Sequence, residues 1–122
     1  MDILVTNNPL AKEHFQSKFK VDFLEADISG IFVRVRNLIH EGHKLLTHPL
    51  TGSVKPNETY YKSVLITEKT NKTDFGSVGI IEDCIQTVNK FPAGKIPDNL
   101  PEEIIYDMQL VDLSLICSAL DK

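Results

Sequence analysis

Residues of the types that carry out chemistry gather between positions 47 and 59. They include His48, Gly52, Ser53 and Lys55. Histidine side chains change charge near neutral pH, so His48 is a candidate general acid or base, or a side chain that bonds the loop backbone. Amides near glycine and serine bind small anions, and a lysine ammonium adds a positive charge. The segment therefore predicts either an anion site or, because prolines and turn residues stiffen it, a structural loop.

A second polar run follows the first apolar run of the chain, where Thr6, Asn7 and Asn8 precede Pro9. In open α/β sheets, ligands bind beyond the carboxyl ends of the strands. If the sheet is parallel, this run and the segment 47–59 lie at one edge and form two walls of a cleft. The candidate binding residues are Thr6, Asn7, Asn8, Thr47, His48, Gly52, Ser53, Lys55 and Asn57.

Apolar periodicity predicts the elements that hold these residues in place. Short apolar runs indicate strands, and apolar residues three and four positions apart indicate helices. Their alternation predicts one α/β domain over residues 1–122. We expect about four strands in a mostly parallel or mixed sheet with helices on both faces, a Rossmann-like three-layer sandwich. The expected strands are 3–5, 21–24, 45–47 and 64–67, and the expected helices are 9–18, 28–41, 80–88 and 102–120.

A proline-rich connection at 92–101 leads to the last expected helix, 102–120. Apolar residues cover more than half of this helix, so it is either deeply buried or shared with a second copy of the chain in a homodimer. Asp112 interrupts its apolar side. The carboxylate lies either at the rim of the buried face or inside it beside a polar partner.

Composition excludes several classes of protein. The chain has 122 residues and a net charge of −4 with scattered lysine and arginine, which disfavours nucleic-acid binding. Residues 1–8 lack the features of a signal peptide, and no apolar run is long enough to span a membrane. We therefore expect a cytoplasmic protein.

Metal, cofactor and redox sites are not expected. The nearby residues His40, His43 and His48 are predicted at different ends of the sheet, so they do not form a shared metal site. Cys84 and Cys117 lie in apolar helical patterns, which favours two buried thiols, and the chain has no CxxC pair.

The segment LLTHPLTGSVKPNETYYKSV, together with TNNPL near the amino terminus, resembles the GrdX proteins. These are small proteins encoded beside the glycine, sarcosine and betaine reductase components of amino-acid-fermenting anaerobes. The likeness extends through the helix expected before Phe91. It implies a cytoplasmic protein associated with the selenocysteine-dependent reductase pathway, and it implies no activity.

Two functions follow from these observations. The first is a non-catalytic accessory protein that binds a reductase subunit or a small anionic metabolite at the 47–59 loop. The second is a small enzyme that uses His48 as acid or base on a metabolite bearing a phosphate or carboxylate group. A third interpretation makes the loop purely architectural, bracing a dimer built on the last helix.

Overall fold

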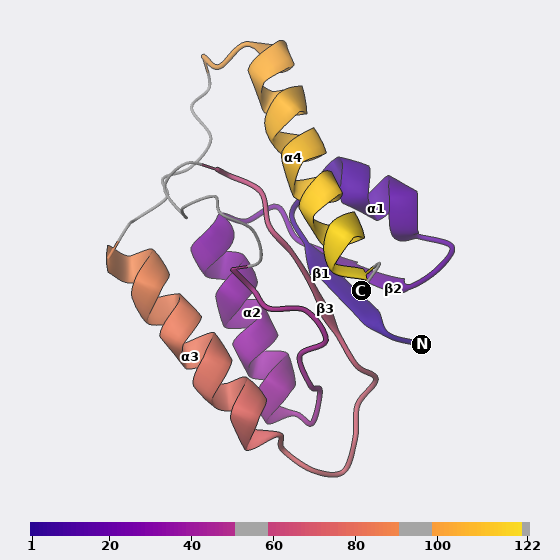
Figure 1. Cartoon of the computed structure of the whole chain (residues 1–122), viewed down its shortest axis with the longest axis vertical. Helices are drawn as coiled ribbons and strands as arrows, with labels where there is room; N and C mark the ends of the chain where they lie inside the picture. Colours follow the sequence, from indigo (N-terminus) through magenta and orange to yellow (C-terminus); the bar gives the residue numbers. More distant parts are fainter. Residues whose placement is uncertain (51–58, 91–98, 121–122) are drawn as a thin grey trace.

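The computed structural model describes residues 1–50, 59–90 and 99–120, and in this part helices cover both faces of a three-stranded sheet (Figure 1). The expected α/β class is confirmed. The elements in chain order are β1 (Ile3–Thr6), α1 (Pro9–Phe15), β2 (Lys20–Phe23), α2 (Ile28–His40), β3 (Ser63–Ile66), α3 (Phe75–Lys90) and α4 (Glu102–Leu120).

The strand order is β2-β1-β3, with β1 parallel to β2 and antiparallel to β3. This mixed sheet has three strands in the described residues, and the expected four-stranded, mostly parallel arrangement is not confirmed. The expected strand 45–47 forms only a single bridge, between Leu45 and Ile66. Its pairing ends there because the Leu65 amide donates to the Thr47 hydroxyl at 3.0 Å instead of to a backbone carbonyl.

Alternate residues of the strands point into two separate cores, as the pleat requires. On one face, Val5 of β1 and Val64 of β3 pack against α2 and α3. On the other face, Leu4 and Leu65 pack against α1 and Ile116 of α4. The sheet is therefore the middle layer of three, and α1 and α4 cover the face opposite to α2 and α3.

Side chains and one glycine set the helix ends. The Asn8 side chain accepts from the Leu10 amide at the start of α1, and Asp27 caps α2 in the same way. After α2, Gly42 has φ +116°, and a Cβ there would lie 2.3 Å from the Thr70 carbonyl oxygen. Gly42 therefore ends this helix in a conformation that favours glycine.

The last helix is less buried than its composition suggests. Within α4, only Asp112 and Ile116 are buried, and four large apolar side chains are exposed. Asp112 is only 4% exposed, so the carboxylate lies inside the protein and not at the rim of the buried face. Among the described helices, none combines the length and hydropathy needed to cross a membrane.

Candidate functional site

Polar side chains concentrate at the edge of the sheet where β1 ends and β3 begins. Thr6 is the register partner of Ser63 at this edge. The connections from β1 and β2 leave for opposite sides of the sheet, with α1 on one face and α2 on the other (Figure 1). Open α/β sheets place their ligand sites beyond the carboxyl ends of such strands, and the end of β1 lies at this edge.

A chain of hydrogen bonds joins this edge to α4. The Asn8 amide donates to the Thr6 hydroxyl at 3.0 Å, and that hydroxyl lies 2.7 Å from the Ser63 hydroxyl. Ser63 donates to Oδ2 of Asp112 at 2.7 Å, so the proton between the two hydroxyls comes from Thr6. Asn8 Nδ2 also donates to Asp112 Oδ2, at 3.0 Å. These bonds polarise one another and fix the carboxylate against the strand ends.

The side chain of Asn7 forms hydrogen bonds to three backbone positions near this chain of bonds. Its Nδ2 donates to the carbonyls of Ala26 and Tyr60, each at 2.8 Å. Its Oδ1 accepts from the Lys62 amide at 2.9 Å. One side chain thus holds the segment before α2 and the segment before β3 at the end of β1.

The charged groups of the site are Lys62 and Asp112. Lys62 is only 4% exposed. Burial lowers the pKa of Lys62, and the nearby charge of Asp112 opposes this change. Burial raises the pKa of Asp112, while hydrogen bonds from Ser63 and Asn8 and the charge of Lys62 oppose the rise. Each charge thus favours the charged form of the other in an environment that favours neutral forms.

We call Thr6, Asn7, Asn8, Lys62, Ser63 and Asp112 the strand-edge cluster. Three of its members are among the residues predicted from the sequence, namely Thr6, Asn7 and Asn8. The sequence analysis missed Lys62 and Ser63. The available signal was a lysine between aromatic residues and an apolar strand. Asp112 carried a clearer signal, because it interrupts an apolar helix face.

Of the other predicted residues, Thr47 lies along the far side of β3. The amide of Thr47 donates to the Leu65 carbonyl at 3.3 Å, and the side chain of Thr47 is buried. Since Leu45 pairs antiparallel to β3, this segment runs in the same direction as β1 and toward the same edge. However, β3 separates it from the end of β1. The two polar runs therefore lie at the same edge of the sheet, on either side of β3.

His48 is exposed, and its Nδ1 accepts from the Leu50 amide at 3.1 Å. This bond matches the interpretation of His48 as a residue that fixes the local backbone. The predicted residues Gly52, Ser53, Lys55 and Asn57 lie outside the described part of the chain, as does most of the connection 92–101.

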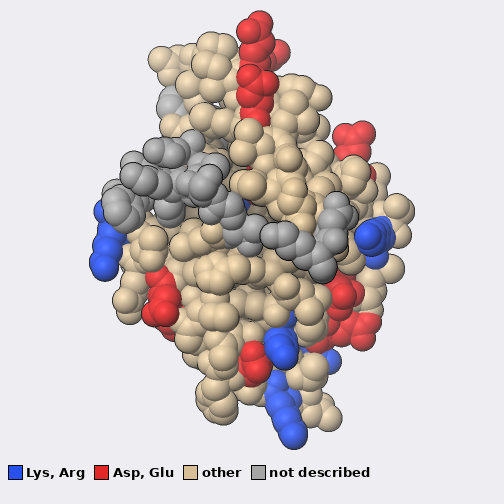
Figure 2. Space-filling model, viewed as in Figure 1, with Lys and Arg blue, Asp and Glu red and all other residues tan. Residues whose placement is uncertain are grey.

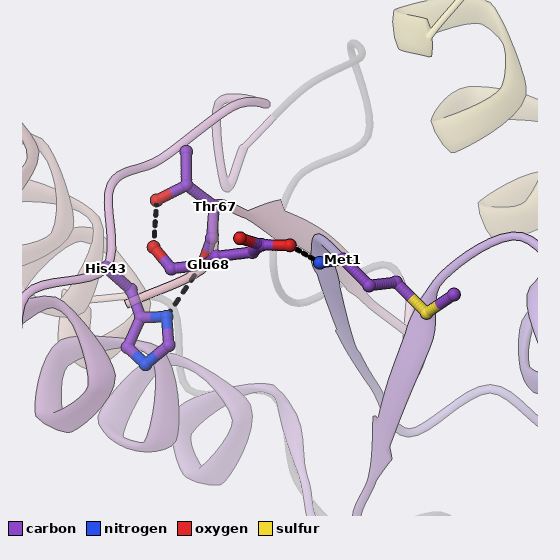
Figure 3. A network of polar contacts seen from close by, with 4 residues as sticks. All are labelled: Met1, His43, Thr67 and Glu68. Carbon is purple, nitrogen blue, oxygen red and sulfur yellow. Dashed lines mark hydrogen bonds and ion pairs between the residues drawn. The ribbon is translucent and has the colours of Figure 1, made fainter. Parts of the chain in front are cut away.

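The buried His43 lies at the opposite end of β3 from the cluster. Its Nδ1 is 2.7 Å from the Thr67 carbonyl oxygen (Figure 3). In the same corner, the amino group of Met1 pairs with the carboxylate of Glu68. His43 therefore contributes to the packing of the loop after α2, away from the strand-edge cluster.

The two cysteines have different surroundings. Cys84 of α3 is 2% exposed, and burial raises the pKa of its thiol to about 11. Cys117 of α4 is half-buried, and its Sγ lies 4.0 Å from Nε2 of His14. The expectation of a buried thiol is confirmed for Cys84, while Cys117 lies closer to the surface.

A groove of about 450 Å³ lies beside the amino-terminal half of α4. Gln109 connects it to the cluster, because its carbonyl accepts from Asn8 Nδ2 at 2.8 Å. Glu102 and Glu103 stand at the groove and make it unsuitable for an anion.

The fold and the cluster define a small three-layer α/β domain with a charged polar site at one edge of its sheet. A family model described as GrdX-like protein matches residues 3–121. The chain therefore belongs to the GrdX-like family. This match includes α4 and thus extends beyond the region in which the sequence alone showed the resemblance. Searches of curated proteins and of solved structures found no match.

Proposed function

We propose that this chain is a non-catalytic, cytoplasmic accessory protein of the glycine reductase system that binds a small anionic metabolite at the strand-edge cluster. Membership of the GrdX-like family supports the association with that system. The observation that carries the proposed site is the burial of Lys62, which is only 4% exposed at the sheet edge.

A buried ammonium destabilises a protein unless a negative group compensates it. Asp112 provides part of this compensation, and its own pKa is raised by burial. In the proposal, the carboxylate or phosphate group of the ligand binds beside Lys62 and adds to these interactions.

Polar residues near this position orient the ligand in the proposal. Thr6, Asn7 and Asn8 form the rigid wall at the end of β1. The predicted contributions of Thr47, His48, Gly52, Ser53, Lys55 and Asn57 to binding belong to the same proposal. A subunit of the reductase is the other occupant that family membership suggests.

Thermal unfolding with added ligands tests the proposal. The panel contains phosphate, acetyl phosphate, glycine, sarcosine and betaine. A ligand at 100 times its dissociation constant should raise the free energy of unfolding by about 2.7 kcal/mol. We expect this gain in the wild type and in Lys69→Met, which removes an exposed lysine at the other end of β3, but not in Lys62→Met.

His48→Ala tests separately whether the predicted 47–59 segment contributes to binding. The proposal predicts that this exposed substitution weakens binding and leaves the fold intact. Equal ligand-induced gains in the wild type, Lys62→Met and His48→Ala would contradict the proposed site. If no ligand in the panel gives a gain, the reductase subunits become the partners to test.

The alternative, an enzyme with His48 as acid or base, stays a prediction from the sequence. The described residues add no support for this enzyme, because Nδ1 of His48 accepts a hydrogen bond from the Leu50 amide and the ring is on the surface. Catalysis would require the ring to reach a reacting group in a closed site.

A further inference from the structure

The outward side of α4 is apolar although no described element covers it. Ile104 and Val111 are 42% and 46% exposed, and both lie on the side of the helix away from Ile116. Met108 and Leu115, on the same side of the helix, are half-buried. Exposed apolar groups gathered on one element mark an interaction surface more often than scattered ones do.

The spacing of these residues is that of a helix-pairing seam. Ile104, Met108, Val111 and Leu115 are separated by four, three and four positions. At 100° per residue they fall within an arc of roughly 60° and form one stripe along three turns. Apolar residues that alternate at three and four positions are the pattern by which one helix packs against another.

The charge along the stripe is of one sign. Glu103 and Asp107 lie one turn apart on α4 along one side of the stripe, and α4 contains no lysine or arginine. In Figure 2, the end of the molecule where α4 begins shows acidic side chains and no basic ones. In paired helices, the residues that flank the seam select the partner by opposite charge.

We propose that the seam formed by Ile104, Met108, Val111 and Leu115 docks an amphipathic helix of another protein whose flanking residues are basic. Large apolar residues of that helix, such as leucine, pack into the seam, and its lysines or arginines face Glu103 and Asp107. A second copy of this chain lacks such residues on α4, so it does not satisfy the charge requirement in either orientation. This surface is separate from the strand-edge cluster and does not depend on the proposed metabolite.

Two designed peptides provide the test with the full-length protein. Both are about three heptads long with leucine at the core positions, and one carries lysine and the other glutamate at the flanking positions. Fluorescence anisotropy of labelled peptides measures binding. The lysine peptide should bind at least about tenfold more tightly than the glutamate peptide, and high salt should reduce this difference.

Neighbouring residues of α4 give matched variants. Val111→Ser should weaken binding of the lysine peptide by about tenfold, whereas Leu110→Ser should change it less than about twofold. Leu110 is the control because it is 40% exposed, close to Val111, but lies outside the seam. Glu103→Lys combined with Asp107→Lys should reverse the preference between the peptides.

Three results would overturn the proposal. They are absence of binding by the lysine peptide, equal binding of the two peptides, or equal effects of Val111→Ser and Leu110→Ser. Sedimentation velocity adds a fourth result. A dimer of the wild type that dissociates in Val111→Ser would show that a second copy covers the seam.

Discussion

Replacing Asp112 by alanine should detach α4 from the sheet edge. The carboxylate accepts hydrogen bonds from Ser63 at 2.7 Å and from Asn8 at 3.0 Å. Hydrogen bonds to a charged group each contribute about 1.5–3 kcal/mol, and loss of the carboxylate also removes a negative charge that favours the charged form of Lys62. Relief of the desolvation of Asp112 offsets part of this loss. We expect the free energy of unfolding to fall by about 3 kcal/mol, within the range seen when one member of a buried charge pair is removed.

Urea unfolding followed by circular dichroism measures this change. Asp107→Ala is the matched control, because it removes an exposed carboxylate from the same helix and should change stability by less than about 0.5 kcal/mol. Asp112→Asn keeps an acceptor oxygen and removes the charge, so its loss should be smaller than that of Asp112→Ala. Equal stability of Asp112→Ala and Asp107→Ala would refute the structural role assigned to the cluster.

Three other substitutions or measurements follow from the structure. Because burial lowers the pKa of Lys62, the unfolded state binds more protons just below pH 10.5, so the free energy of unfolding should rise with pH there in the wild type but not in Lys62→Met. Ellman's reagent at mildly alkaline pH should modify Cys117 in the native protein and reach Cys84 only after denaturation, since the Cys84 thiol is buried with its pKa raised to about 11. In urea unfolding, Gly42→Ala should destabilise the protein by about 2 kcal/mol through its positive φ and its clash, whereas Gly79→Ala, with nothing within 4 Å of the added Cβ, should stabilise α3 by about 0.5–1 kcal/mol.

Local patterns in the sequence predicted much of the fold. The apolar run before Thr6 gave β1, Pro9 after Asn8 gave the start of α1, and Gly42 gave the end of α2. These features depend on residues close together in the chain, where capping and backbone preference act directly. The start of α3 was predicted too late, because the stretch FGSVG before Ile80 contains two glycines, which disfavour a helix.

Long-range contacts explain what could not be predicted. Leu45 and Leu46 have the composition of a strand, but the contact of Thr47 with Leu65 ends the pairing, and it joins residues 18 positions apart. The bond between Asn8 and Asp112 spans 104 positions. Periodicity gives the face of a helix on which Asp112 lies, whereas its partner depends on which strand end meets that face.

The sequence pattern also could not predict how much of α4 is exposed. Its apolar residues cover most of the helix circumference, which fits both a deeply buried helix and one with an external partner. The structure distinguishes these cases, since Ile116 is buried while Val111 is 46% exposed.

The most direct test of the central claim is a titration of the ¹⁵N-labelled protein with phosphate, acetyl phosphate and the reductase substrates, observed through its backbone amide resonances. The account predicts saturable shifts of Asn7, Asn8, Lys62 and Ser63 with at least one of these ligands, and loss of the shifts in Lys62→Met. Saturable shifts confined to other residues, or shifts of the cluster that persist unchanged in Lys62→Met, would contradict a metabolite site at the sheet edge.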